Sequence, residues 1–153
     1  MKIEIKQITD LNIGLLEKLA VEAHIEGHKF VQRAIDEWKS GLNNFSKKGE
    51  ILFGIFISKI CEGIGGLNID PFIENPSIGR IRHVYISQDH RRKGFATLLL
   101  RKIIHIASKH FELLRLYTGI PNASSFYESL GFIPSKGFKM LHILKNLKTW
   151  KSI

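Results

Sequence analysis

The sequence predicts an α/β protein (α+β mixed sheet), with a central twisted mixed β-sheet and helices on both faces. Strand-like and helix-like segments follow one another in the order β-α-α-β-β-β-α-β-α-β. A helical pattern over 95–111 separates two strand patterns, 80–87 and 113–120, so we expect a crossover that makes these strands parallel neighbours. The 153 residues, 44% of them hydrophobic, suffice for one compact domain, and we expect 1–153 to form it.

The N-terminal half is predicted as one strand, one or two helices and two further strands. Ile3, Ile5 and Ile8 open the chain at strand-like spacing, and residues 11–40 carry apolar side chains at helical intervals. Turn-forming residues fill the stretch SGLNNFSKKGE. ILFGIFISK and CEGIGGLNI then read as two strands of a meander.

The C-terminal half is predicted as three strands and two helices. RIRHVYIS follows a loop that contains Pro and Asn, and the apolar residues from Ala96 to Phe111 then recur at helical spacing. LLRLYTGI reads as a strand, and PNASSFYESLG reads as a short helix that Gly131 stops. The last strand is expected within GFKMLHILKNL.

Charge and cysteine content narrow the class of protein. The formal net charge of +9 favours anionic partners, whether nucleic acid, an acidic surface or a phosphorylated small molecule. A single cysteine, Cys61, allows no intrachain disulfide framework, so we expect a reducing, cytoplasmic location. The N-terminus lacks an apolar signal core and the longest apolar run, ILFGIFI, is too short to span a bilayer, so we expect no membrane partner.

The stretch QDHRRKGFATLLLRK places three cations and small residues just before a helix. The first turn of a helix leaves backbone N–H groups without partners and adds positive potential, so phosphate oxygens bind there readily. Gly94 and Ala96 are small enough to let a phosphate approach the main chain, and Arg91, Arg92 and Lys93 offer donors at the rim. An ordinary basic turn is the alternative.

Two motifs make this chain resemble the GCN5-related N-acetyltransferases (GNAT). Arg91-x-x-Gly94-x-Ala96 matches the R/Q-x-x-G-x-G/A loop between a strand and a helix, and NASSFYESLGF at 122–132 is similar to a second signature of that family. The resemblance covers essentially the whole chain and is concentrated in 80–132. Arg92 stands where many relatives have glycine, and Gln88 where proline is frequent.

The resemblance implies a GNAT acyl-CoA N-acyltransferase fold and acetyl-CoA as co-substrate, with no metal. The main chain of Val84, Tyr85 and Ile86 would pair with the pantetheine arm and stabilise the oxyanion. The pyrophosphate would bind the amides of the loop and helix start, and Asn122 would approach the coenzyme. The loop and helix residues implied are Arg91, Arg92, Lys93, Gly94, Phe95, Ala96 and Thr97.

Two side chains are candidates for proton transfer. By resemblance, Tyr127 would act as general acid, because a phenol with a pKa of about 10 stays protonated and can donate to a thiolate of pKa about 8.5. The alternative is a core tyrosine packed beside Phe126 and Leu130. His83, on the strand that leads into the site, is a candidate general base, the alternative being a buried structural histidine.

Other residues with potential chemistry are assigned more modest roles. His28, Phe30 and Trp38 are candidates for an acceptor-binding rim, or else an ordinary solvated helix face. His24 and His28 do not reproduce the H-E-x-x-H zinc motif, since Ile25 follows the first histidine. Gly63, Gly65 and Gly66 are expected at a turn or bulge, and Cys61 has no motif of an acyl-carrying nucleophile.

The sequence therefore predicts an acetyl-CoA-dependent N-acetyltransferase that acts on a primary amine of a small molecule, protein or peptide. The alternatives are a GNAT-fold enzyme with another acyl donor and a basic nucleic-acid-binding module. We do not favour nucleic acid as a partner, because the C-terminal lysines are not interleaved with aromatic side chains. The acceptor would be selected by residues 20–45 and the 70–80 loop, and a homodimer is compatible with the resemblance.

Overall fold

The computed structural model describes residues 2–11, 14–135 and 141–151. The N-terminal half comprises β1 (Ile3–Gln7), α1 (Glu17–Ile25), α2 (Phe30–Ser40), β2 (Ile51–Ile57) and β3 (Ile60–Ile69). The C-terminal half comprises β4 (Ile78–Ile86), α3 (Phe95–Ala107), β5 (Leu113–Tyr117), α4 (Pro121–Ser129), β6 (Ile133–Pro134) and β7 (Leu141–Leu144). Short 3-10 helices, η1 (Gln88–His90) and η2 (Leu147–Thr149), follow β4 and β7.

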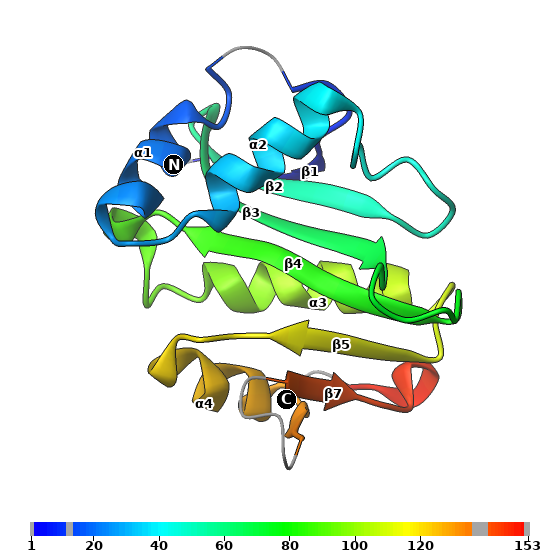
Figure 1. The fold of residues 1–153 in the computed structure, drawn as a ribbon. Coiled ribbons are helices and arrows are strands. Elements are labelled where there is room, and N and C mark those ends of the chain that lie inside the picture. The colour runs from blue at the N-terminus through cyan, green and yellow to red at the C-terminus, as the bar shows by residue number, and fades with distance from the viewer. Residues whose placement is uncertain (1, 12–13, 136–140, 152–153) are drawn as a thin grey trace.

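The described strands form one mixed sheet in the order β1-β2-β3-β4-β5-β7-β6 (Figure 1). β4 and β5 are parallel, whereas the other neighbouring strands are antiparallel. α3 connects the parallel pair, as the sequence predicts, and the α/β mixed-sheet class is confirmed. Among the described residues, no helix is long and apolar enough to cross a membrane.

Helices cover both faces of the sheet. α1 and α2 lie on the face toward the viewer in Figure 1, over β2 and β3, and α3 lies behind the sheet. The apolar side of α3 is fully buried against the sheet through Leu99, Leu100, Ile103 and Ile104. A separate cluster joins α1 and α2 to the opposite face. β2 is buried along its whole length, which explains its unbroken apolar sequence ILFGIFI.

The glycines of β3 allow close packing. A Cβ on Gly65 would lie 2.9 Å from Leu99 Cδ2 of α3, and one on Gly66 would lie 2.7 Å from the Phe45 ring on the other face. The sheet can therefore approach α3 closely where β3 has no side chains. The sequence predicts a turn or bulge at these glycines; instead they lie inside β3, and the bulge between Ile64 and Gly66 has its extra residue on β4.

Several observed element boundaries differ from those predicted; the strand expected over 113–120, for example, ends at Tyr117. α3 ends at Ala107 instead of Phe111, because the chain leaves the helix by a turn that still buries the Phe111 ring. β6 has two residues, too few for a periodic pattern. The final strand occupies Leu141–Leu144 of the predicted 137–147, and 137–140 lie outside the described residues.

Candidate active site

β4 and β5 pair only at their beginnings. The ladder joins Ile78–Arg80 to Leu113–Arg115, and beyond it Leu116 and Tyr117 pair with β7 alone. β4 continues to Ile86 without a β5 partner, and both strand ends point to the left in Figure 1. The two facing edges thus leave backbone groups available to an extended ligand, as at other unpaired strand edges.

A bulge interrupts β4 beside this opening. Ile64 pairs with Tyr85 and Gly66 pairs with Arg82, so Gly65 of β3 faces both His83 and Val84. His83 adopts a left-handed backbone conformation with φ of 59°. Bulges of this kind redirect the chain and its side chains, so the β4 main chain here is not committed to a regular ladder.

The His83 ring is buried between β4 and the α1/α2 layer. Its exposed fraction is 7%, and neither ring nitrogen has a hydrogen-bond partner. Burial, with the nearby Arg82 charge second, lowers the pKa of His83 to about 3. The Phe30 backbone opposes this shift slightly, although no hydrogen bond of normal geometry joins it to the ring. The ring is therefore neutral at physiological pH.

The loop between β4 and α3 presents a row of free amides. Arg92 and Gly94 have φ of 61° and 84°, and the first bond to a loop carbonyl runs from Leu98 N to Gly94 O at 3.1 Å. Among the described residues, no acceptor receives the N–H groups of 92–97. A Cβ on Gly94 would meet no atom within 4 Å. This open cradle at a helix start fits a pyrophosphate group.

The side chain of Arg91 turns away from that cradle. Its guanidinium forms two hydrogen bonds with the Glu26 carboxylate, at 2.7 and 2.6 Å, and its Nε donates to the Ile86 carbonyl at 2.9 Å. Tyr85 donates its hydroxyl to the same carboxylate. Arg91 thus ties α1 to the end of β4, and the exposed cations of the loop are Arg92 and Lys93. The predicted rim donor Arg91 is already engaged.

Glu26 was missed by the sequence analysis. Hydrogen bonds from Arg91 and Tyr85 lower its pKa to about 2, against the opposing effect of burial. The partners lie 65 and 59 residues away along the chain, so no local motif connects them. The candidate site therefore contains a fixed carboxylate between α1 and the loop that precedes α3.

α4 contributes the other predicted residues. Asn122 is exposed in its first turn, whereas Tyr127 is buried in edge contacts with the Phe126 and Phe132 rings. Burial alone raises the pKa of Tyr127 well above its ordinary value. No hydrogen bond joins its hydroxyl to a described residue, and the hydroxyl is not among the fully buried atoms that lack a partner. Tyr127 is thus a protonated phenol inside the apolar layer behind the sheet.

The predicted rim residues lie in an aromatic layer over β4. The ring centroids of His28 and Phe30 are 5.4 Å apart, and Phe30 meets Tyr85 at 6.1 Å. Trp38 reaches β4 indirectly, through Phe45, whose ring lies 6.3 Å from that of His83. The structure brings these residues to the face of β4 that carries His83 and Tyr85, and their role in binding stays a prediction.

Cys61 is a buried thiol 3.4 Å from the Gly63 carbonyl. Burial raises its pKa to about 11, so the thiolate that a nucleophile needs is scarce. Within the described ranges, no group of His, Cys, Asp or Glu side chains is arranged to hold a metal ion.

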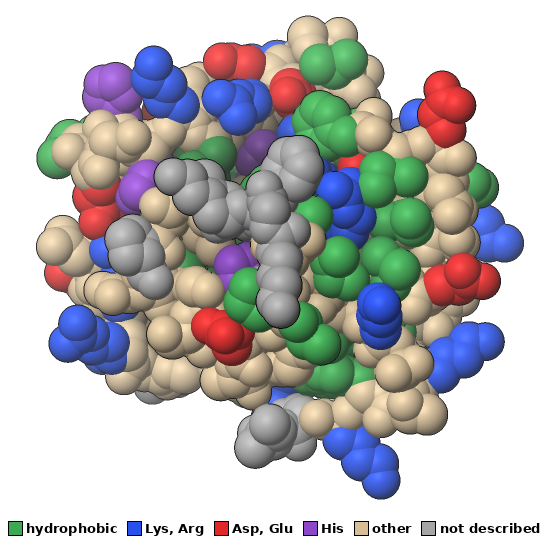
Figure 2. Space-filling view, turned by 60° about the horizontal axis from the view of Figure 1, so that its bottom comes forward, with side chains coloured by type: hydrophobic (Ala, Val, Ile, Leu, Met, Phe, Trp, Pro, Cys, Tyr) green, Lys and Arg blue, Asp and Glu red, His purple; other side chains and the backbone are tan. Residues whose placement is uncertain are grey.

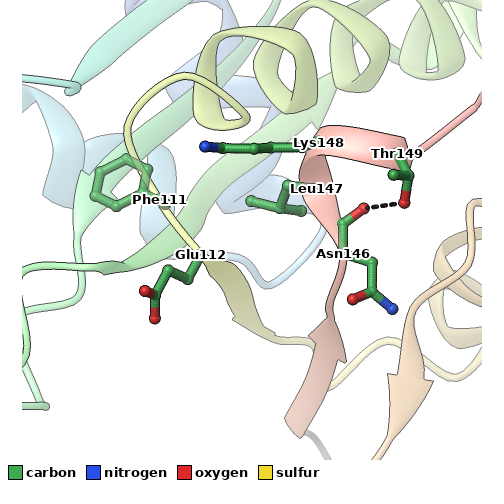
Figure 3. Close-up of a pocket in the computed structure, with 6 residues that line it drawn as sticks. All are labelled: Phe111, Glu112, Asn146, Leu147, Lys148 and Thr149. Atoms are coloured by element: carbon green, nitrogen blue, oxygen red, sulfur yellow. Dashed lines mark hydrogen bonds between the residues drawn. The ribbon is translucent and has the colours of Figure 1, made fainter.

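A cavity of about 290 Å³ lies apart from these residues. Figure 3 shows it between the segment before β5 and the chain after β7, with Glu112 directed away from Lys148. The Thr149 hydroxyl donates to the Asn146 carbonyl at 3.2 Å on its wall. This cavity lies at the start of β5, whereas the opening lies where β4 and β5 end. We therefore exclude the cavity from the candidate site.

The chain is similar to known acetyltransferases. Residues 49–134 match a family model described as an acetyltransferase (GNAT) domain. No curated protein matches the chain at a significant level. A crystal structure of a candidate acetyltransferase from Exiguobacterium sp. 255-15 is 29% identical, covers 95% of this chain and 94% of that chain, and superposes with a TM-score of 0.84.

Two more distant structures share the fold. PaiA N-acetyltransferase from Thermoplasma acidophilum, in complex with coenzyme A, is 23% identical, covers 95% of this chain and 99% of that chain, and has a TM-score of 0.67. A GNAT-family acetyltransferase from Staphylococcus aureus Mu50 is 18% identical, covers 96% and 100% of the two chains, and has a TM-score of 0.69. Because the family model spans more than half of the sequence, from just before β2 to the end of β6, this chain belongs to the GNAT acetyltransferase family.

Proposed function

We propose that the protein is an acetyl-CoA-dependent N-acetyltransferase that transfers an acetyl group directly to a primary amine of a small molecule, protein or peptide. The observation that carries the proposal is the opening between β4 and β5, which ends at the free amides of residues 92–97. A long ligand with an anionic middle and an amide-containing arm matches such a site. The unpaired strand edge offers partners for the amides, and the free N–H groups of 92–97 offer partners for the phosphates.

The two ends of the opening suit two parts of acetyl-CoA. The amides of 92–97 and the open space at Gly94 suit the pyrophosphate, with Arg92 and Lys93 exposed beside it. The unpaired edge of β4 at Val84, Tyr85 and Ile86 suits the pantetheine arm, whose amides can replace a missing strand. The coenzyme A bound to the PaiA structure supports this choice of ligand.

Acetyl-CoA supplies the acetyl group as a thioester. A neutral amine forms the new N–C bond, the C–S bond breaks, the amine loses one proton and the thiolate gains one. We assign the second proton to Tyr127, whose raised pKa keeps its hydroxyl protonated. The same raised pKa makes transfer to a thiolate of pKa about 8.5 uphill unless the phenol recovers a proton from water, so the hydroxyl first donates a strong hydrogen bond while the charge develops and then passes its proton to the sulfur as water replaces it.

The base is assigned by position. His83 lies at the bulge and is the candidate, yet its pKa of about 3 makes the ring a weak proton acceptor. An alkylammonium group has a pKa of about 10, so this ring does not readily take a proton from it directly. We therefore expect the acceptor to react from its neutral form, with His83 guiding the proton toward water.

The test is calorimetric titration of acetyl-CoA into the protein in the presence of EDTA. We expect saturable binding to the wild type and a loss of at least about 100-fold in affinity for Gly94→Glu, because a carboxylate a few ångströms from phosphate repels it. Gly41→Glu is the matched control, since Gly41 also has a positive φ of 80° and no atom within 4 Å of an added Cβ. Equal affinities for the two variants would overturn the site.

A further inference from the structure

Three arginines lie side by side on the sheet face that carries α1 and α2. Arg80 and Arg82 are two residues apart on β4, and Arg80 is in register with Arg115 of β5. Arg82 approaches Glu37 of α2, which identifies the face. The side chains are only 13–17% exposed. Arg80 and Arg115 form the last pair of the β4–β5 ladder, and Arg82 lies just beyond it, on the far side of the bulge from the amides of 92–97.

Asp70 and Glu37 each pair with one arginine of this group, and Arg80 is left without an acceptor of its own. Asp70 Oδ2 accepts a hydrogen bond from Arg115 at 2.9 Å, and Glu37 lies 3.8 Å from Arg82. Arg80 Nη1 is 3.9 Å from the same Asp70 oxygen, is buried and has no hydrogen-bond partner. Buried charged donors are normally satisfied, so an unpaired one points to a missing acceptor.

Aromatic rings hold the Arg80 guanidinium in place. Its central carbon lies 4.6 Å from the centroid of the Phe72 ring and 4.3 Å from that of Tyr117. Contacts with ring faces restrain the planar group while its N–H edge remains the route for hydrogen bonds. A guanidinium restrained in this way pays little entropy when it binds a carboxylate or a phosphate with two parallel hydrogen bonds.

A cavity of about 480 Å³ opens beside the arginines. Its charged wall residues are Arg82, Lys47, Glu37, Glu50 and Asp70. Arg80 is not part of the wall but contacts two wall residues, Asp70 and Phe72. Arg82 directly precedes His83, and strands rise about 3.3 Å per residue, so Arg80 lies about 10 Å along β4 from the bulge. A molecule about 10 Å long would therefore match the separation between Arg80 and the bulge.

We propose that Arg80, restrained by Phe72 and Tyr117 and flanked by Arg82 and Arg115, binds an anionic group of the amine acceptor, either a carboxylate or a phosphate. The inference rests on the proposed acetyl transfer and adds the substrate class. The acceptor then carries an amine at one end and an oxyanion at the other, and its amine reaches the bulge while Arg80 holds the anion.

The experiment compares amines that differ only in the anion. 6-Aminohexanoate is paired with 6-aminohexanamide, and O-phosphoethanolamine with ethanolamine, in acetyl-CoA-dependent release of coenzyme A. We expect kcat/KM to be about 10- to 100-fold higher for one anionic member than for its neutral partner, the usual value of charge-assisted hydrogen bonds. The pair that responds distinguishes carboxylate from phosphate.

Variants then locate the preference. Arg80→Gln is expected to abolish it, through KM more than kcat, without changing the affinity for acetyl-CoA. Arg101→Gln, an exposed arginine on α3 on the other face, is the control and is expected to retain it. If Arg80→Gln fails to fold, Phe72→Ala is the substitute variant. Phe72 is 70% exposed, so its replacement leaves the core intact, and we expect it to weaken the preference.

Direct binding separates this proposal from the proposed function. The affinities of 6-aminohexanoate and O-phosphoethanolamine are measured by calorimetry without acetyl-CoA, in wild type and Arg80→Gln. If binding depends on Arg80 but no acetyl transfer occurs, the proposed anion site stands and the proposed reaction is wrong. Acetyl transfer that ignores the anion, or that Arg80→Gln and Phe72→Ala leave equally selective, would overturn the anion site alone, as would binding of neither probe.

Discussion

Two buried titratable side chains in the candidate site lack hydrogen-bond partners among the described residues. His83 is held neutral with a pKa of about 3, while burial raises the pKa of Tyr127. The direction differs because burial disfavours the charged form of each group, the imidazolium in one and the phenolate in the other. Both groups therefore present their neutral forms to a ligand. Neutral side chains can donate hydrogen bonds, but neither is a strong base.

Replacing Tyr127 by Phe tests the role of the hydroxyl. The ring contacts with Phe126 and Phe132 are retained, and the hydroxyl has no described partner to lose, so we expect little change in melting temperature. Turnover is expected to fall about 10²- to 10⁴-fold, the usual contribution of a positioned acid. Steady-state kinetics, a melting curve and acetyl-CoA affinity are measured for both proteins. Wild-type turnover in a folded variant would assign Tyr127 to the core alone, provided that chemistry limits the rate.

At the scale of elements, the position of α3 depends on the absence of side chains at the glycines of β3. Gly65 leaves room for Leu99 and Ile103, both fully buried, and the same residue faces the β4 bulge. The start of α3, with its free amides, is thereby held near the end of β4. Close packing of sheet and helix thus determines where the loop between β4 and α3 lies.

Gly65→Ala tests this packing. Its Cβ would lie 2.9 Å from Leu99 Cδ2 and 3.0 Å from Ile103 Cδ1, so we expect a loss of about 1–3 kcal/mol in the free energy of unfolding. Leu99→Ala removes the nearest contact at its own cost, and the double variant is expected to lose less than the two single variants combined. Urea unfolding of all four proteins measures the coupling. Additive losses would show that β3 and α3 do not constrain each other at this point.

At the scale of the whole molecule, the chain carries a net positive charge. On the face drawn in Figure 2, Lys and Arg side chains lie singly or in small groups between hydrophobic, acidic and other surface. The net charge of +9 raises the local concentration of anions in general. The amides at the start of α3, in contrast, are directed donors at one place, and this favours a particular small anion over a polyanion.

Salt dependence distinguishes these two kinds of binding. Affinity for a single-stranded RNA is expected to fall steeply between about 50 and 200 mM salt, as counterion release requires, while acetyl-CoA still saturates the protein at the higher salt. Lys145→Gln combined with Lys148→Gln should weaken RNA binding without affecting acetyl-CoA, because both exposed lysines lie far from the loop. Tight RNA binding that persists at 200 mM salt would instead favour the nucleic-acid alternative.

The sequence alone determined the order of elements and the parallel crossover around α3, and it predicts an anion-binding loop at the start of that helix. These depend on residues close together in the chain: apolar periodicity sets α3, and Gly94 with Ala96 sets the loop before it. The two-residue strand β6 could not be predicted, since a pattern that short has no period. Phe111 continued the helical pattern although it lies in the following turn, because burial and not helicity selects an apolar residue there.

The tertiary structure alone decided how distant segments meet at the site. The Arg91–Glu26 pair joins residues 65 positions apart, and the β4–β5 ladder stops at Arg80 because the strands diverge beyond it. The orphan nitrogen of Arg80 likewise exists only because Asp70 is already bonded to Arg115. In each case, folding brings together several groups that could bind one another. The spacing of residues along the sequence does not show which of them form the contact.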